Sequence, residues 1–144
     1  MTWVVVDSGL ALKLVLNETD SHLAEALWQR WLRDDLQPVA PSLFYFEVTA
    51  VLRKHVYRGS ITPERGAQAL QQALKFKVKL IDSPDLHERA WRLAAELNRP
   101  TAYDAHYLAA AEELKCDFWT ADERLYNSAR NRLAWVYWLG NFSS

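Results

Sequence analysis

The sequence predicts an α/β fold with a mostly parallel sheet and helices on both of its faces. Two observations lead to this prediction. Apolar segments of strand length alternate along the chain with longer segments of helical spacing. The first short segment, TWVVVD at residues 2–7, contains a continuous apolar run, which is typical of a parallel strand buried on both faces. Alternating strands and helices indicate βαβ connections, which produce a parallel sheet.

Two helices are expected between the first strand and the second. Residues 8–19 form the first, because Asp7 and the serine after it are residues that start helices. Residues 21–35 form the second, with Ser21 as N-cap and large apolar residues at helical spacing. The proline-bounded segment QPVAP, residues 37–41, then predicts a second strand.

The middle of the chain predicts a pair of helices and a strand. The first helix runs from Ser42 to about Tyr57 and ends at Gly59, a typical helix terminator. The second covers residues 62–74, since it opens with Thr-Pro, an N-cap followed by proline at the first helical position. In KFKVKLID, residues 75–82, charged and apolar residues alternate, which predicts a half-exposed strand.

The last third continues the alternation. Residues 85–98 and 101–114 have helical spacing of their apolar positions. CDFWTAD, residues 116–122, reads as a strand followed by a turn, and LAWVYWL, residues 133–139, reads as the closing strand. No internal repeat, low-complexity segment or linker interrupts this order.

Length and composition limit the possible functions. At 144 residues we expect a single domain over 1–144. The net charge of −1 means that a polyanionic partner must be held by local patches or by a metal ion. The one cysteine, Cys116, has no partner for a disulfide or a thiolate metal site. We expect a cytoplasmic protein without membrane association, because neither a signal peptide nor an apolar run of about 18 residues is found.

Glu47 needs an explanation, because it interrupts an apolar pattern. Its neighbours at helical spacing form an apolar face made of Leu43, Phe44, Ala50 and Val51. Burying a lone carboxylate on such a face is costly, so other groups must compensate for its charge.

Three further acids share the position of Glu47 near the carboxyl end of a predicted strand. Asp7 ends the first strand, Asp104 lies in the first turn of the helix over 101–114, and Asp122 follows the strand DFWT. The carboxyl ends of parallel strands meet at one edge of the sheet, where ligands bind. The sequence therefore predicts one acidic pocket at this edge.

Four ionised carboxylates would repel one another in a shared pocket, by roughly 4 kcal/mol for each pair about 4 Å apart at an effective dielectric constant of about 20. A divalent cation would neutralise them, and oxygen ligands favour Mg²⁺, or Mn²⁺ in its place, over zinc. Such an ion recruits phosphate oxygens and activates water, which indicates phosphodiester hydrolysis. For Asp104 or Asp122 alone, capping of a helix N-terminus is the simpler explanation, so the inference depends on all four acids.

Four segments carry a resemblance to a known family: VVVDSGLALKLVLNE, APSLFYFEVTAVLRK, AYDAHYLAAAEEL and FWTADERL. In this order they resemble the PIN-domain ribonucleases, and most closely the VapC-type toxins of toxin–antitoxin pairs. The resemblance implies a three-layer α/β/α sandwich and a magnesium-dependent endoribonuclease. It implies Asp7 and Asp104 as principal metal ligands, Glu47 and Asp122 completing the pocket, and the Thr120 hydroxyl supporting it. It also implies an RNA substrate, a homodimer and an antitoxin protein that blocks the site.

One position departs from the family pattern. The family often has a small hydroxyl or amide residue two positions after the first Asp, where this chain has Gly9. Ser8, one position earlier, is the candidate to support the pocket instead.

Several basic residues are candidates for contacts with RNA phosphates, and solvation of the surface is the alternative for each. The best placed are Arg53, Lys54 and Arg124. Three alternating lysines in KFKVKL, Lys75, Lys77 and Lys79, are better explained as protection of a sheet edge against pairing with other chains.

Other functions compete with a toxin nuclease. One is a housekeeping RNA-processing nuclease without an antitoxin, and another is a catalytically silent RNA-binding or interaction module. A phospho-accepting signalling domain is disfavoured, because Asp7 is followed by Ser8 and LAWVYWLGNFSS contains no lysine. A phosphatase with an aspartate nucleophile would need a second Asp where Gly9 stands.

Overall fold

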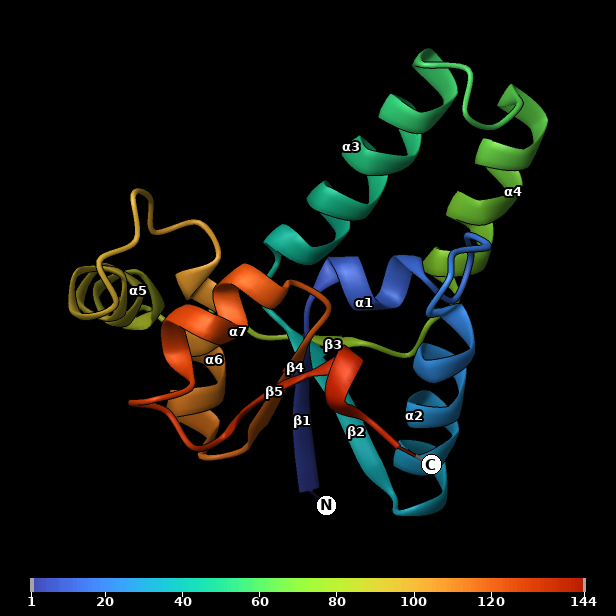
Figure 1. Ribbon diagram of the computed structural model, residues 1–144. Helices are drawn as coiled ribbons and strands as arrows, with labels where there is room; N and C mark the ends of the chain where they lie inside the picture. Colours follow the sequence, from blue (N-terminus) through green and yellow to red (C-terminus); the bar gives the residue numbers. More distant parts are fainter. Residues whose placement is uncertain (1, 144) are drawn as a thin grey trace.

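The computed structural model describes residues 2–143, and at its centre lies a five-stranded sheet in which all paired strands are parallel (Figure 1). The strands are β1 (Thr2–Val6), β2 (Leu36–Ala40), β3 (Lys79–Leu80), β4 (Asp117–Thr120) and β5 (Val136–Trp138). Their order is β3-β2-β1-β4-β5, which makes β1 the central strand. The predicted α/β fold class is confirmed.

Helices flank this sheet. Within the described residues they are α1 (Ser8–Leu12), α2 (Ser21–Arg33), α3 (Leu43–Tyr57), α4 (Pro63–Leu74), α5 (Leu86–Glu96), α6 (Ala105–Leu114), α7 (Glu123–Ala129) and the 3₁₀ helix η1 (Leu139–Asn141). Figure 1 shows α2 on one side of the sheet and α5 and α6 on the other. It also shows α3 and α4 as a hairpin that extends past the carboxyl ends of the strands.

The central position of β1 explains its continuous apolar run. Val4, Val5 and Val6 are at most 2% exposed, because helices cover the sheet on both faces. The strand then ends at Asp7, which is the first polar residue after the buried run. The central strand of the sheet therefore delivers a carboxylate to the carboxyl edge of the sheet.

Both ends of α3, the helix that carries Glu47, are fixed by hydrogen bonds. Asp82 accepts from the backbone N–H of Ser42 at 3.1 Å and from the Ser42 hydroxyl. At the other end Gly59 has a φ of +77°, and the Ser60 N–H donates to the His55 carbonyl at 2.9 Å. Glycine adopts this left-handed conformation without steric cost, so its predicted role as helix terminator is confirmed.

The strand predicted over 75–82 is wrong for its first half. Only Lys79 and Leu80 pair with β2, at the edge of the sheet. Phe76 instead packs on Trp28, with ring centroids 5.4 Å apart, and its N–H closes a turn on Ala73 at 3.1 Å. The contact of one aromatic ring with α2 therefore replaces the strand pairing that the alternating pattern predicted.

The helix predicted over 8–19 is also too long, because α1 ends at Leu12. Three-residue turns follow it, with the N–H of Lys13 donating to the Leu10 carbonyl and that of Val15 to Leu12. The Lys13 ammonium lies 2.8 Å from the Asp20 carboxylate. This ion pair folds the following loop back against the end of α1.

Three smaller differences concern element boundaries. Asp20, rather than Ser21, is the N-cap residue of α2, and the Ser21 hydroxyl donates to the Leu16 carbonyl at 2.8 Å. The turn predicted at the end of residues 116–122 is present as a bend at Ala121, but the helix that follows it, α7 from Glu123, was not predicted. The closing strand occupies only Val136–Trp138 of the predicted 133–139. Among residues 2–143, no helix is both long enough and apolar enough to cross a bilayer.

Candidate active site

A cavity of about 370 Å³ opens at the carboxyl edge of the sheet. All four predicted carboxylates line it: Asp7, Glu47, Asp104 and Asp122. They come from four places in the sequence, which are the end of β1, the second turn of α3, and the residues just before α6 and α7. The parallel sheet therefore brings these acids to one edge, as strand order and helix starts require.

Asp7 is the most buried of the four acids, with 7% of its surface exposed. Its Oδ1 accepts from the Leu10 N–H at 2.9 Å and from the Ala121 N–H at 3.5 Å, and its Oδ2 accepts from the Thr120 hydroxyl. Burial raises the pKa of Asp7 to about 6, although these three donors oppose the rise. Without a cation, Asp7 therefore gains or loses its proton near neutral pH.

Thr120 links two of the acids. Val6 is paired with Trp119 in the register of β1 and β4, so the residues after them, Asp7 and Thr120, lie side by side. The fully buried Thr120 hydroxyl donates to Asp7 and accepts from the Asp122 N–H at 2.9 Å. A hydroxyl is required here, because a single side-chain atom must both donate and accept.

Glu47 is half-buried at the cavity wall rather than in the core. Its Oε1 accepts from the Tyr107 hydroxyl at 2.5 Å and from the Ser8 hydroxyl at 3.2 Å. Burial raises the pKa of Glu47, and these two donors act against the rise. The compensation that the sequence required for Glu47 thus comes from two hydroxyl groups and from the open cavity.

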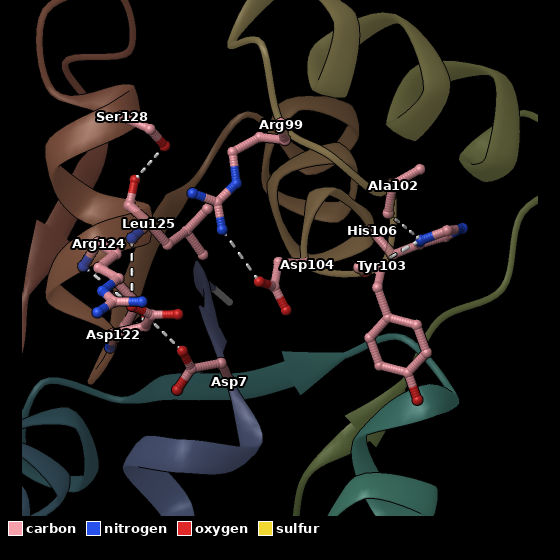
Figure 2. Close-up of polar contacts among 11 residues, drawn as sticks. Asp7, Arg99, Ala102, Tyr103, Asp104, His106, Asp122, Arg124, Leu125 and Ser128 are labelled. Carbon is pink, nitrogen blue, oxygen red and sulfur yellow. Dashed lines mark hydrogen bonds and ion pairs between the residues drawn. The ribbon is translucent and has the colours of Figure 1, made fainter.

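Asp104 is the N-cap residue of α6, and its Oδ2 lies 3.4 Å from Nη2 of Arg99. Burial is the main reason why its pKa is raised, and the nearby Asp122 carboxylate adds to the effect, while Arg99 opposes it. Figure 2 shows the Arg99 side chain reaching toward Asp104 at the space shared by the Asp7, Asp104 and Asp122 carboxylates. The Arg99 guanidinium therefore lies beside this group of acids.

Asp122 caps α7. Its Oδ1 accepts from the N–H of Arg124 at 2.9 Å and of Leu125 at 3.2 Å. The capping explanation for this residue is therefore correct, yet it leaves the second oxygen of the carboxylate free to face the cavity. Capping and a role in the pocket are compatible at this position.

The predicted phosphate contacts lie outside the cavity lining. Arg53, Lys54 and Arg124 are exposed, and the described residues that line the cavity include none of them. The guanidinium of Arg53 instead lies 5.9 Å from the centroid of the Tyr57 ring. Arg124 touches the site through its backbone N–H, which donates to Asp122, and the side chains of the three residues do not form the walls of the cavity.

Two residues at the site were not identified from the sequence. Tyr107 reads as one of the apolar positions of its helix, and Arg99 precedes the segment that carries the family resemblance. For Tyr107 a signal existed, because Asp104 and Tyr107 are three residues apart and so project from neighbouring positions of one helix. For Arg99 no signal existed, since its place depends on how the loop turns.

The donor set suits a divalent cation, because it consists of carboxylate oxygens without nitrogen or sulfur ligands. Among the described residues, the hydrogen bonds of Glu47, Asp104 and Asp122 each use a single carboxylate oxygen, so the second oxygen of each remains available. Across residues 2–143, no three acidic, histidine or cysteine side chains converge on one point as metal ligands do. The acids thus share a cavity and do not form a tight ligand cage.

Comparison with known proteins gives a consistent result. The family model of the PIN domain matches residues 4–131 of this chain. A VapC ribonuclease from Mycobacterium bovis and ribonuclease VapC9 from Mycobacterium tuberculosis are each 32% identical to it over 127 residues. Each alignment covers 88% of this chain and 91% of the relative.

Solved structures share the fold. PAE2754 from Pyrobaculum aerophilum has a TM-score of 0.63 and 23% identity, covering 88% of this chain and 86% of that chain. A toxin–antitoxin complex from Klebsiella pneumoniae has a TM-score of 0.64 and 19% identity, with coverage of 92% and 94%. VapC20 from Mycobacterium tuberculosis, described as a Sarcin-Ricin loop cleaving toxin, has a TM-score of 0.65 and 15% identity, with coverage of 87% and 94%.

Proposed function

The chain belongs to the PIN-domain family, and on this basis we propose that it is a divalent-metal-dependent endoribonuclease acting as the toxin of a toxin–antitoxin pair. The observation that carries the proposal is the meeting of Asp7, Glu47, Asp104 and Asp122 at one cavity. The 32% identity to two proteins named as VapC ribonucleases supports RNA as the substrate. We take the whole chain, residues 1–144, as a single nuclease domain.

The ion that these residues suit best is Mg²⁺, with Mn²⁺ as a substitute, because both prefer oxygen ligands. Asp7 and Asp104 are the proposed principal ligands, and Glu47 and Asp122 complete the acidic pocket. A divalent ion bound here supplies charge to polarise the scissile phosphate and to lower the pKa of water.

The chain's own residues then have distinct roles. Thr120 holds Asp7 in one orientation through its hydroxyl, and Tyr107 and Ser8 hold Glu47 in the same way. The raised pKa of Glu47 makes this half-buried carboxylate a suitable acceptor for a proton from an attacking water. Arg53, Lys54 and Arg124, which border the site, are the proposed contacts to more distant phosphates of the RNA.

Two protein partners belong to the proposal. A toxin of this kind requires a cognate antitoxin, and the structural likeness to a toxin–antitoxin complex supports one. We also propose a homodimer in the cytoplasm. Exposed aromatic side chains such as Phe46 and Tyr57, which are 72% and 81% exposed, provide apolar surface for such contacts.

Incubation of the purified protein with a panel of structured RNAs tests the nuclease function. Cleavage in Mg²⁺ or Mn²⁺, its loss in EDTA and its loss in Asp104→Asn would support the proposal. An Arg30→Gln variant, which changes an exposed arginine side chain of α2, serves as the control and should cleave normally. Equal behaviour of wild type and Asp104→Asn in every condition would instead favour a catalytically silent RNA-binding or interaction module.

The toxin function needs its own test. Expression of the chain alone should arrest growth of a bacterial host, and co-expression of a reading frame adjacent to its gene should restore growth. A nuclease that does not slow growth, with no partner frame beside its gene, would be a housekeeping RNA-processing enzyme.

A further inference from the structure

Arg99 places a guanidinium beside Asp104, one of the acids that line the cavity, although it lies outside the four segments that resemble the family. Its side chain is 21% exposed, and its Nη2 lies 3.4 Å from Oδ2 of Asp104. Figure 2 shows this side chain extending from its loop toward the carboxylates of the site. An arginine so placed must affect any charged group that enters the cavity.

The backbone directs Arg99 toward the cavity by a helix-ending turn. Helix α5 ends at Glu96, and Asn98 takes a left-handed conformation with a φ of +52°. The N–H of Arg99 then donates to the Ala94 carbonyl at 2.8 Å, and that of Asn98 to the Ala95 carbonyl at 3.1 Å. This is the hydrogen-bond pattern of a Schellman motif, which reverses the chain direction after a helix. The base of the Arg99 side chain is thus held by α5, while its tip contacts the residue that begins α6.

Arg99 differs from the other cation at the cavity. Lys13 lines the cavity, whereas Arg99 reaches it through its contact with Asp104. The Lys13 ammonium pairs with the Asp20 carboxylate at 2.8 Å and the Glu18 carboxylate at 3.8 Å. Both partners lie outside the four proposed ligands. Among the described residues, the ion pair from Arg99 to Asp104 is the one that joins a cation to a member of this set.

The contact between Arg99 and Asp104 suits a temporary partner. It joins one nitrogen to one oxygen at 3.4 Å, whereas a strong arginine–carboxylate pair is bidentate and shorter. A divalent cation on Asp104 would repel the guanidinium, since two positive charges would then share one carboxylate. The planar guanidinium of arginine binds phosphate in bidentate fashion, so a released Arg99 has a natural partner in the RNA backbone.

From this arrangement, which rests on the proposed function, we propose that Arg99 is the resident counter-ion of the cavity. It holds Asp104 while no divalent ion is bound, and the ion displaces it. The displaced guanidinium then binds a phosphate of the RNA, so that ion loading and substrate binding are coupled. Arg99 is thus both a competitor of the ion and a contact of the substrate.

Binding of Mn²⁺ alone to the metal-free protein tests whether Arg99 competes with the ion for Asp104. Calorimetric titration should show tighter Mn²⁺ binding in Arg99→Gln than in wild type, by roughly threefold to tenfold. Arg99→Lys keeps the charge and should stay near wild type. Arg30→Gln, which removes an arginine that pairs with Asp34 on α2, should not change the affinity. A merely structural role for Arg99 predicts the opposite sign, because a loosened site binds the ion less tightly.

Binding of a 2′-O-methyl stem–loop RNA in Mn²⁺ tests whether the displaced Arg99 contacts an RNA phosphate. Arg99→Gln should weaken RNA binding by roughly threefold to tenfold. It should also make the dependence of log affinity on log salt concentration shallower, by about one in the magnitude of the slope. Unchanged or weaker Mn²⁺ binding in Arg99→Gln would overturn the inference while leaving the nuclease proposal intact, and so would unchanged RNA binding. Absence of Mn²⁺ binding in both proteins would overturn the inference together with the metal site.

Discussion

The Tyr107 hydroxyl, on α6, donates a 2.5 Å hydrogen bond to the Glu47 carboxylate, on α3. These residues are 60 positions apart in the sequence and meet only at the cavity. Tyr107 is 2% exposed, and its ring stacks on Phe118 with centroids 5.8 Å apart. A buried, stacked aromatic ring therefore positions the Glu47 carboxylate of α3 at the cavity.

We expect Tyr107→Phe to reduce RNA cleavage by roughly 10-fold to 100-fold, the usual effect of removing a group that orients a ligand of a metal site. The ring and its stacking stay, so the fold should be retained. Tyr103→Phe, at an exposed tyrosine four residues earlier, is the matched control. Equal rates for the two variants would show that the hydrogen bond to Glu47 does not matter for activity.

Thr120→Val should lower the free energy of unfolding by about 1–3 kcal/mol, because it removes a buried donor to Asp7 and leaves the Asp122 N–H without its acceptor. Thr120→Ser keeps the hydroxyl and should retain most of the activity. Urea denaturation and RNA cleavage measure the two effects. A valine variant as stable and active as wild type would contradict the role assigned to this hydroxyl.

The metal-free protein should lose stability as the pH rises from about 4 to above 6. Burial raises the pKa of Asp7 from 3.8 to about 6, so the folded protein binds this proton more tightly than the unfolded chain does. The stabilising contribution is complete below pH 4 and is lost as the pH passes 6, with a total of about 3 kcal/mol. Glu47 and Asp104, whose pKa values are also raised, act in the same direction.

Urea denaturation in EDTA between pH 4.5 and 7.5 measures this dependence. Asp7→Asn cannot ionise at this position and should show a flatter profile than wild type. Added Mn²⁺ should stabilise wild type mainly at the higher pH, since the ion prefers the ionised carboxylate. Parallel profiles for wild type and Asp7→Asn would mean that Asp7 titrates normally.

Gly9 should tolerate a side chain. A β-carbon there would lie 3.7 Å from the Ala121 β-carbon and from Oδ1 of Asp7, which are ordinary contact distances. Gly9→Ala should therefore keep cleavage and raise the free energy of unfolding by up to about 1 kcal/mol, since Gly9 lies within α1.

Gly66→Ala is the matched comparison for Gly9. At Gly66 a β-carbon would approach Cγ2 of Val56 to 2.3 Å, so this variant should be destabilised where Gly9→Ala is not. Thermal unfolding of both variants measures the difference. Loss of stability in Gly9→Ala would show that the departure from the family pattern is required by packing in this chain.

The sequence was a good guide to the fold where strong local patterns agree with tertiary contacts. The valine run of β1 and the Thr-Pro start of α4 are such cases, and Thr62 caps α4 with a bond of 3.1 Å to the Arg65 N–H. The prediction from the sequence failed where a single tertiary contact decides the local conformation. Phe76 packs against Trp28, and of the strand that charge alternation predicted over 75–82 only Lys79 and Leu80 form.

The same distinction applies to the site. The four acids follow strand ends and helix starts, which local patterns locate, so their meeting was predictable. The roles of Tyr107 and Arg99 were not predicted, because they depend on where the folded chain places these side chains. Tyr107 is a buried aromatic whose hydroxyl alone touches the site, and Arg99 depends on the left-handed turn at Asn98. The three-residue spacing from Asp104 is the one sequence signal for Tyr107, and nothing in the sequence indicates the place of Arg99.

The central claim is that the four carboxylates act as one ion-dependent site, and calorimetric titration of Mn²⁺ into the metal-free protein tests it most directly. We expect Asp7→Asn and Asp104→Asn each to weaken Mn²⁺ binding at least about tenfold, and Glu47→Gln and Asp122→Asn to weaken it less. Asp34→Asn removes an exposed acid at the C-terminal end of α2 that does not line the cavity, and this variant should bind like wild type. Mn²⁺ affinity that is unchanged in both Asp7→Asn and Asp104→Asn would contradict the account.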